Sequence, residues 1–199
     1  EYFVLFLPLI GSIISGFFGK MLKDRNCEIL TSLFVSISAL LSLIIFYKVI
    51  IVGYENNIVI TTWINSGSLN VNWSINIDTL SSVMLVVVTL VSSLVHVYSI
   101  GYMAHDPHKT RFMSYLSLFT FAMLTLVTSD NFIQLFFGWE GVGLCSYFLI
   151  GFWFKKPSAN AAAIKAFLVN RVGDFGFALG IFLIFYLFGT VNYDEVFQR

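Results

Sequence analysis

The chain alternates between long apolar runs and short polar segments. Six of the runs are long enough to cross a bilayer as a helix, which takes about 20 residues. The runs are continuous and do not alternate polar with apolar residues, so they predict helices and not the strands of a membrane barrel. We therefore expect an all-α integral membrane protein. Its predicted spans are Tyr2–Phe18, Ile29–Val52, Leu80–Tyr102, Phe112–Thr128, Asn131–Phe154 and Ala161–Phe188.

The segment between the second and third spans, residues 54–79, is the one long connection in the sequence. Two runs rich in β-branched residues lie within it, Ile58–Trp63 and Leu69–Ile75, and they flank a turn at Asn65–Ser68 that contains Gly67. This pattern predicts a short β-hairpin with a glycine turn. An irregular amphipathic loop is the alternative interpretation.

Basic residues distinguish the two ends of the predicted helices. The connections after the first, third and fifth spans carry Lys and Arg, whereas those after the second and fourth carry none. By the positive-inside rule, the basic connections face the cytoplasm or the mitochondrial matrix, and the N-terminus and hairpin face outside. Lys48, near the outer end of the second span, is an exception that can snorkel to the interface. The basic residues concerned are Lys20, Lys23, Arg25, Lys109, Arg111, Lys155 and Lys156.

Composition supports a membrane protein and narrows its chemistry. Hydrophobic residues make up 58% of the chain and charged residues 11%, whereas a soluble domain carries about a quarter charged residues. The net charge of +0 provides no field that would attract nucleic acid. Cys27 and Cys145 fit neither a disulfide framework nor a metal site. No pair of helix histidines is available for haem, so we expect no cofactor in this chain.

The chain begins with Glu1 and ends at Arg199, just after an apolar run. We therefore expect it to be part of a longer protein. The first apolar run lacks both a basic lead and a small-residue cleavage site, so no cleavable signal peptide is predicted.

Four charged residues in the last two spans are the candidate functional residues: Glu140, Lys165, Arg171 and Asp174. A charge at the centre of a span costs about 2.5–3.5 kcal/mol, and it usually marks a pathway. Counted from the inner ends of their spans, Glu140 and Asp174 lie at depths of about 21 Å and about 20 Å. Two carboxylates at one level in a low dielectric need a cation beside them. Arg171 shares a helix face with Asp174, so it is expected to pair with it.

Lys165 and His96 each have two possible roles. Lys165 is nine residues before Asp174 and points to nearly the opposite helix face, so it either snorkels to the inner interface or serves a separate partner. His96 lies within the third span, where it either relays protons or bonds a neighbouring helix. The alternative for all of these charges is an ion pair that only holds helices together.

Two long motifs carry a family resemblance: TSDNFIQLFFGWEGVGLCSYFLIGFW at residues 128–153 and ANAAAIKAFLVNRVGDFGFALGIF at residues 159–182. Together with HVYSIGYM and IDTLSSVM, they closely resemble the antiporter-like membrane subunits of respiratory complex I. This is the family of bacterial subunit L and mitochondrial subunit 5. The resemblance spans essentially the whole chain. It implies a longer protein of more than a dozen helices with two inverted half-channels.

The resemblance also implies how this chain is divided and what it does. Residues 1–110 would form three leading helices with the outer hairpin, and residues 111–199 the first three helices of a half-channel. Glu140 would be a proton-path carboxylate that pairs with a lysine beyond Arg199, with Asp174 close to that pair. The chain would translocate protons, coupled to electron transfer elsewhere in the complex.

The same resemblance implies the surroundings of the chain. The whole complex would use NADH, FMN, iron–sulfur clusters and quinone. The partners would be lipid and other membrane-arm subunits, and the location the bacterial plasma membrane or the mitochondrial inner membrane.

Two other functions fit the sequence. Multi-subunit sodium/proton antiporters share the fold, but they usually read Leu-Thr-Ser after Trp-Glu. Here Gly141, Val142 and Gly143 follow, which favours complex I. The third hypothesis is a structural membrane-arm subunit whose buried charges only hold helices together.

Overall fold

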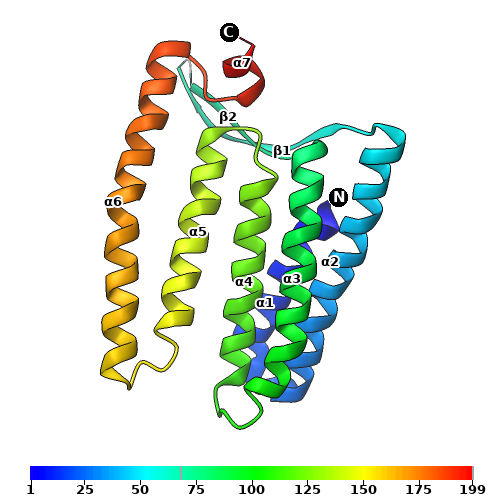
Figure 1. Ribbon diagram of the computed structural model, residues 1–199, viewed down its shortest axis with the longest axis vertical. Helices are drawn as coiled ribbons and strands as arrows, with labels where there is room; N and C mark the ends of the chain where they lie inside the picture. The colour runs from blue at the N-terminus through cyan, green and yellow to red at the C-terminus, as the bar shows by residue number, and fades with distance from the viewer. Residues whose placement is uncertain (68, 199) are drawn as a thin grey trace.

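The computed structural model describes residues 1–67 and 69–198, apart from the side chain of Lys20. It is a bundle of long helices with a two-stranded antiparallel hairpin across one end (Figure 1). In the part that the structure describes, six helices are long and apolar enough to span a membrane. The expected fold class is therefore confirmed. The elements are α1 (Tyr2–Leu22), α2 (Asp24–Val52), β1 (Asn56–Ser66), β2 (Leu69–Ile77), α3 (Thr79–Tyr102), α4 (Lys109–Val127), α5 (Phe132–Ile150), α6 (Pro157–Phe188) and α7 (Tyr193–Phe197).

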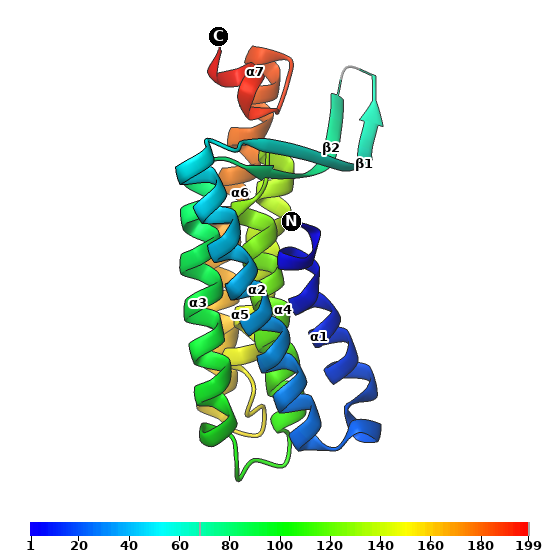
Figure 2. The same ribbon diagram turned by 90° about the vertical axis from the view of Figure 1, so that its right-hand side faces the viewer.

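Each of the six long helices packs against the next one along the chain. Helix α4 packs against α1, α2, α3 and α5, while α6 packs against α5 at one side of the molecule. Figure 2 shows that α1 lies beside α2 and α4, with the hairpin and α7 together at the upper end. The last two long helices therefore form a pair at the edge of the bundle.

The predicted hairpin is confirmed, and it is anchored to α5. The backbone N–H of Ser74 in β2 donates to Oε1 of Gln134 at 3.0 Å, and Nε2 of Gln134 donates back to the Ser74 carbonyl at 2.7 Å. Asn131 caps the start of α5 and donates to the Asn72 carbonyl at 2.9 Å. The turn contains Gly67 with φ +60, whereas the predicted turn residue Ser68 lies outside the described residues.

The short helix α7 and the segment before it were not predicted, yet they hold the upper ends of α5 and α6 together. The N–H of Phe132 donates to the Val191 carbonyl at 3.1 Å, and the N–H of Tyr193 donates to the Asp130 carbonyl at 3.0 Å. Helix α6 ends at Phe188 and is capped by Gly189, whose φ of 71 is left-handed.

Several predicted boundaries are wrong, because polar residues extend some helices beyond their apolar runs, whereas α5 ends before its run does. Helix α2 begins at Asp24 and not at Ile29, since an acidic residue is favourable in a first helical turn. Helix α5 ends at Ile150 and not at Phe154. Helix α6 begins at Pro157, where proline suits the first turn, and not at Ala161.

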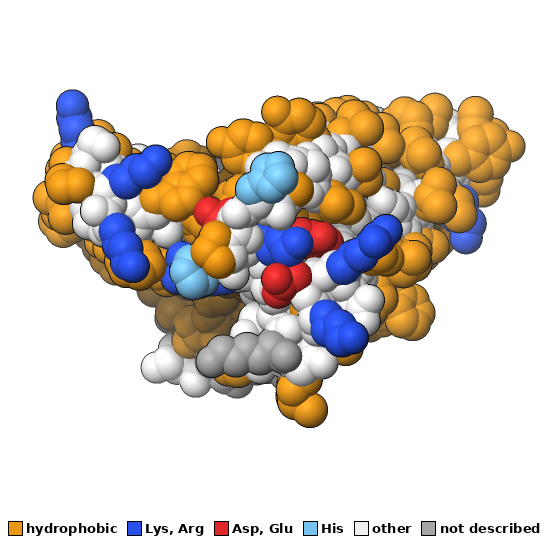
Figure 3. Space-filling model, turned by 90° about the horizontal axis from the view of Figure 1, so that it is seen from below, with side chains coloured by type: hydrophobic (Ala, Val, Ile, Leu, Met, Phe, Trp, Pro, Cys, Tyr) orange, Lys and Arg blue, Asp and Glu red, His pale blue; other side chains and the backbone are white. Residues whose placement is uncertain are grey.

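The lower end of the bundle is the basic one. It is formed by the α1–α2, α3–α4 and α5–α6 connections, and Figure 3 shows Lys and Arg side chains across this end. Asp106 joins two of these connections, since it accepts hydrogen bonds from Trp153 Nε1 at 2.9 Å and from the His108 N–H at 2.7 Å. Desolvation raises the pKa of Asp106, but these bonds and the charges of His108 and Arg111 together lower it below its ordinary value. The side chain of Lys20, also predicted at this end, lies outside the described residues.

Candidate ion-pair site between α5 and α6

Three charged side chains meet midway along the last two long helices. Glu140 is the ninth of 19 residues in α5, and Asp174 is the eighteenth of 32 in α6. Nη1 of Arg171 contacts Oε2 of Glu140 and lies 3.6 Å from Oδ2 of Asp174. One guanidinium therefore lies between two carboxylates, and the expected pairing of Arg171 with Asp174 on one helix face is observed.

Trp139 also forms a hydrogen bond with Asp174. Its indole Nε1 donates to Oδ1 of Asp174 at 2.8 Å, and its ring meets that of Phe177 edge-on at 6.1 Å. The guanidinium carbon of Arg171 lies 4.6 Å from the ring centroid of Phe167, a cation–π contact. Trp139 was not among the residues that the sequence predicted for this site. Its position directly before an intramembrane carboxylate was the available signal, because a tryptophan away from water needs an acceptor for its N–H.

The charges at this site do not balance. With both carboxylates ionised, Glu140, Asp174 and Arg171 carry a net charge of −1. The Asp174 side chain is 10% exposed and that of Glu140 is 22% exposed. An uncompensated negative charge in a poorly solvated place is costly. One further positive charge would therefore neutralise the cluster.

Lys165 is not part of this cluster. Its side chain is exposed on α6, and no carboxylate in the described part of the chain lies within ion-pair distance of it. This agrees with the expectation that it points away from Asp174.

His96 is fully buried in a different interface, between α3 and α4. Its Nδ1 lies 2.7 Å from the Ser92 carbonyl, so this nitrogen carries the hydrogen. Its Nε2 then accepts a hydrogen bond from Ser117 Oγ at 3.0 Å. These contacts bond two helices, and a relay role for His96 stays a prediction.

The described residues contain no group of three or more His, Cys, Asp or Glu side chains that could hold a metal ion. Cys27 and Cys145 are free thiols, buried on α2 and α5.

Two known protein families match segments of the chain. The family described as NADH-Ubiquinone oxidoreductase (complex I), chain 5 N-terminus, matches residues 63–113. The family described as NADH:quinone oxidoreductase/Mrp antiporter, TM, matches residues 129–199, which include the whole ion-pair site.

Individual relatives align along almost the entire chain. NADH-ubiquinone oxidoreductase chain 5 of Chondrus crispus is 55% identical over 195 residues, which cover 98% of this chain and 29% of that protein. Its counterpart in Arabidopsis thaliana is 56% identical over 194 residues, again 98% of this chain and 29% of the relative. NADH-quinone oxidoreductase subunit L of Rickettsia felis is 54% identical over 195 residues, with 98% and 30% covered. The chain thus spans less than a third of the length of these relatives.

A solved structure has the same fold. A chain of the membrane-bound sulfane sulfur reductase, an archaeal respiratory membrane complex, superimposes with a TM-score of 0.83 at 18% identity. The match covers 97% of this chain and 38% of that one. Because relatives from a red alga, a plant and a bacterium share more than half of the aligned residues, the chain belongs to the family of NADH-ubiquinone oxidoreductase chain 5 and NADH-quinone oxidoreductase subunit L.

Proposed function

We propose that this chain is part of a proton-translocating membrane subunit of NADH:quinone oxidoreductase, respiratory complex I, and that Glu140, Arg171 and Asp174 lie on its proton path. The observation that carries the proposal is the guanidinium between two carboxylates near mid-span, which leaves one negative charge. A proton is the smallest species that can neutralise that charge. Family membership supports the same conclusion.

The geometry suggests how the site works. Protonation of Glu140 removes its attraction for Arg171, which then pairs more closely with Asp174, now 3.6 Å away. Loss of that proton reverses the movement. Arg171 stays charged throughout, because a guanidinium does not release its proton in proteins. By the family resemblance, a lysine beyond Arg199 would supply a second cation whose approach favours release from Glu140.

The same family resemblance suggests where the cofactors and partners of the whole complex would lie. NADH, FMN, the iron–sulfur clusters and quinone would be bound by other subunits, and electron transfer there would drive the ion pair here. The partners are the other membrane-arm subunits and lipid. The basic lower end would face the bacterial cytoplasm or the mitochondrial matrix.

The test is proton pumping by the whole complex in vesicles. Glu140→Gln keeps the size and hydrogen bonding of the side chain but cannot ionise, so NADH-driven pumping is expected to fall to less than half. Glu140→Asp keeps a carboxylate about one methylene out of place and is expected to retain part of the pumping. Complex content is measured in parallel. Normal pumping by an assembled Gln variant would show that the site is an ion pair that only holds the helices together.

A sodium/proton antiporter subunit is the second candidate, because the family that matches residues 129–199 is named for both kinds of protein. An antiporter exchanges sodium for protons without electron transfer. Sodium-driven proton movement in vesicles that lack NADH would favour it. We expect pumping that requires NADH and continues in sodium-free buffer.

A further inference from the structure

A cavity of about 340 Å³ lies at the lower end of the bundle, between α4, α5 and α6. Arg111 in the first turn of α4 and Asn160 in the first turn of α6 form its polar part. Tyr115 and Ile164 line it about one helical turn deeper on the same two helices, and Tyr147 lines it from α5. The cavity is therefore polar toward the basic end of the molecule and apolar toward the membrane-spanning part.

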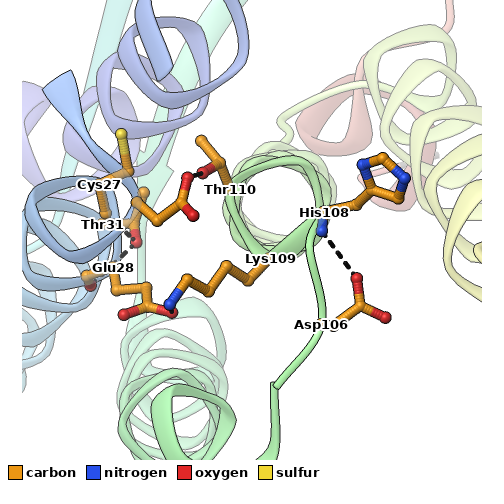
Figure 4. A network of polar contacts seen from close by, with 8 residues as sticks. Cys27, Glu28, Thr31, Asp106, His108, Lys109 and Thr110 are labelled. Carbon is orange, nitrogen blue, oxygen red and sulfur yellow. Dashed lines mark hydrogen bonds and ion pairs between the residues drawn. The ribbon is translucent and has the colours of Figure 1, made fainter. Parts of the chain in front are cut away.

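Arg111 has no counter-charge in the part of the chain that the structure describes. No carboxylate in this part forms an ion pair with it. Lys109, two residues earlier on α4, differs in this respect, because its Nζ lies 3.5 Å from Oε1 of the buried Glu28 on α2 (Figure 4). The positive charge of Arg111 is therefore available to an anion at the cavity.

The hydrogen-bond donors of Arg111 are also incompletely used. A guanidinium has five N–H donors. The Phe152 carbonyl accepts a hydrogen bond from Nη2 at 3.1 Å, whereas Nε is buried and has no partner among the described residues. The guanidinium carbon lies 4.7 Å from the ring centroid of Phe152 and 5.5 Å from that of Phe154. These aromatic contacts hold the guanidinium in place, so a ligand in the cavity would meet donors that are already positioned.

The charges around the cavity favour a negatively charged ligand. Lys155 and Lys156 lie in the connection between α5 and α6 and add two positive charges at this end. Asp106 is the acidic side chain of the α3–α4 connection, and it already accepts a hydrogen bond from the His108 N–H at 2.7 Å (Figure 4). Together with Arg111, three positive charges therefore lie here against one negative charge. Such a surplus attracts anions.

We propose that this cavity binds a phosphate group, with the Arg111 guanidinium as its main donor. A planar guanidinium matches the geometry of phosphate oxygens and can donate two parallel hydrogen bonds to them. A phospholipid headgroup and free phosphate both supply this chemistry. The apolar wall at Tyr115 and Ile164 favours the phospholipid, because an acyl chain can lie against it while the phosphate stays at the basic end. The proposal does not depend on the proton path.

Photolabelling of the whole complex in detergent tests the proposal. The probe is phosphatidylglycerol with a diazirine close to its headgroup, and labelled peptides are identified by mass spectrometry. We expect label on the peptides that contain Tyr147 or Ile164, and at least threefold less of it in Arg111→Gln, which removes the charge. Arg25→Gln is the matched control, because Arg25 is an exposed arginine at the same end and is not among the residues that line the cavity. Its labelling should equal that of the wild type.

Competitors distinguish the two sources of phosphate. Loss of label with excess unlabelled phosphatidylglycerol, but not with inorganic phosphate, would assign the cavity to the phospholipid. Loss of label with inorganic phosphate as well would assign it to the free anion. Label that neither competitor reduces would show nonspecific contact with the probe and overturn the proposal.

Equal labelling of the wild type and Arg111→Gln, or no label on the cavity peptides of the wild type, would also overturn it. If Arg111→Gln fails to assemble, Ile164→Trp decides, because it fills the apolar part of the cavity and leaves Arg111 unchanged. A loss of label in that variant supports the site, and labelling equal to the wild type overturns it.

Discussion

At the scale of single residues, Arg171 determines the arrangement of the candidate site. Its planar guanidinium has five N–H donors, which lets one side chain contact Glu140 on α5 and face Asp174 on its own helix. The three-residue spacing of Arg171 and Asp174 made their pairing predictable from the sequence. The bond from Trp139 to Asp174 was not predictable, since it depends on how α5 is rotated against α6.

Asp174→Asn is expected to weaken proton pumping, and Asp174→Glu to preserve most of it. The amide leaves Arg171 with Glu140 as its one nearby counter-charge and presents no carboxylate to the Trp139 indole. Breaking one side of a buried ion pair costs about 3–5 kcal/mol. Because the Arg171 side chain is 43% exposed, this pair is only partly buried, and we expect a smaller cost.

Pumping is measured beside the amount of assembled complex, so that a folding defect is not mistaken for a functional one. Full pumping by an assembled Asp174→Asn variant would place Asp174 among residues that only hold the helices together.

At the scale of elements, the sequence identified the helices and hairpin but not their contacts. The hairpin was predictable because β-branched runs flank a glycine turn. The Gln134–Ser74 bonds and the Glu28–Lys109 pair join residues 60 and 81 positions apart, and no local periodicity encodes such partners. Helix ends were misplaced where polar turns extend a span, as at Asp24.

Helix α5, which carries Glu140, packs closely against α4. This close contact depends on the absence of a side chain at Gly138. A Cβ at Gly138 would lie 2.7 Å from the backbone of Leu126, so Gly138→Ala must push α5 away from α4. Overpacking of this kind costs about 1–3 kcal/mol. We expect a lower thermal midpoint and less assembled complex. Gly143→Ala is the control, because a Cβ there meets nothing within 4 Å. Equal stability of the two variants would contradict the close packing of these helices.

At the scale of the whole molecule, the distribution of charge sets the expected orientation. The lower end carries most of the Lys and Arg side chains, and the hairpin lies at the opposite end. The same bias was visible in the sequence, because the positive-inside rule depends on which connections carry basic residues and not on tertiary contacts.

Labelling with an impermeant thiol reagent tests this orientation in intact cells or mitoplasts. Cysteine placed at Lys155 should stay unlabelled until the membrane is opened, whereas cysteine at Thr62 on the hairpin should react at once. Cys27 and Cys145 are buried and add little background. Labelling of the Lys155 position from outside would reverse the topology.

The central claim is that the carboxylate of Glu140 carries a proton during turnover. The most direct measurement is the number of protons pumped per electron by the complex with Glu140→Gln, reconstituted in vesicles at wild-type content. The account predicts a ratio below half of the wild-type value, with partial recovery in Glu140→Asp. A wild-type ratio in the fully assembled Gln variant would contradict it.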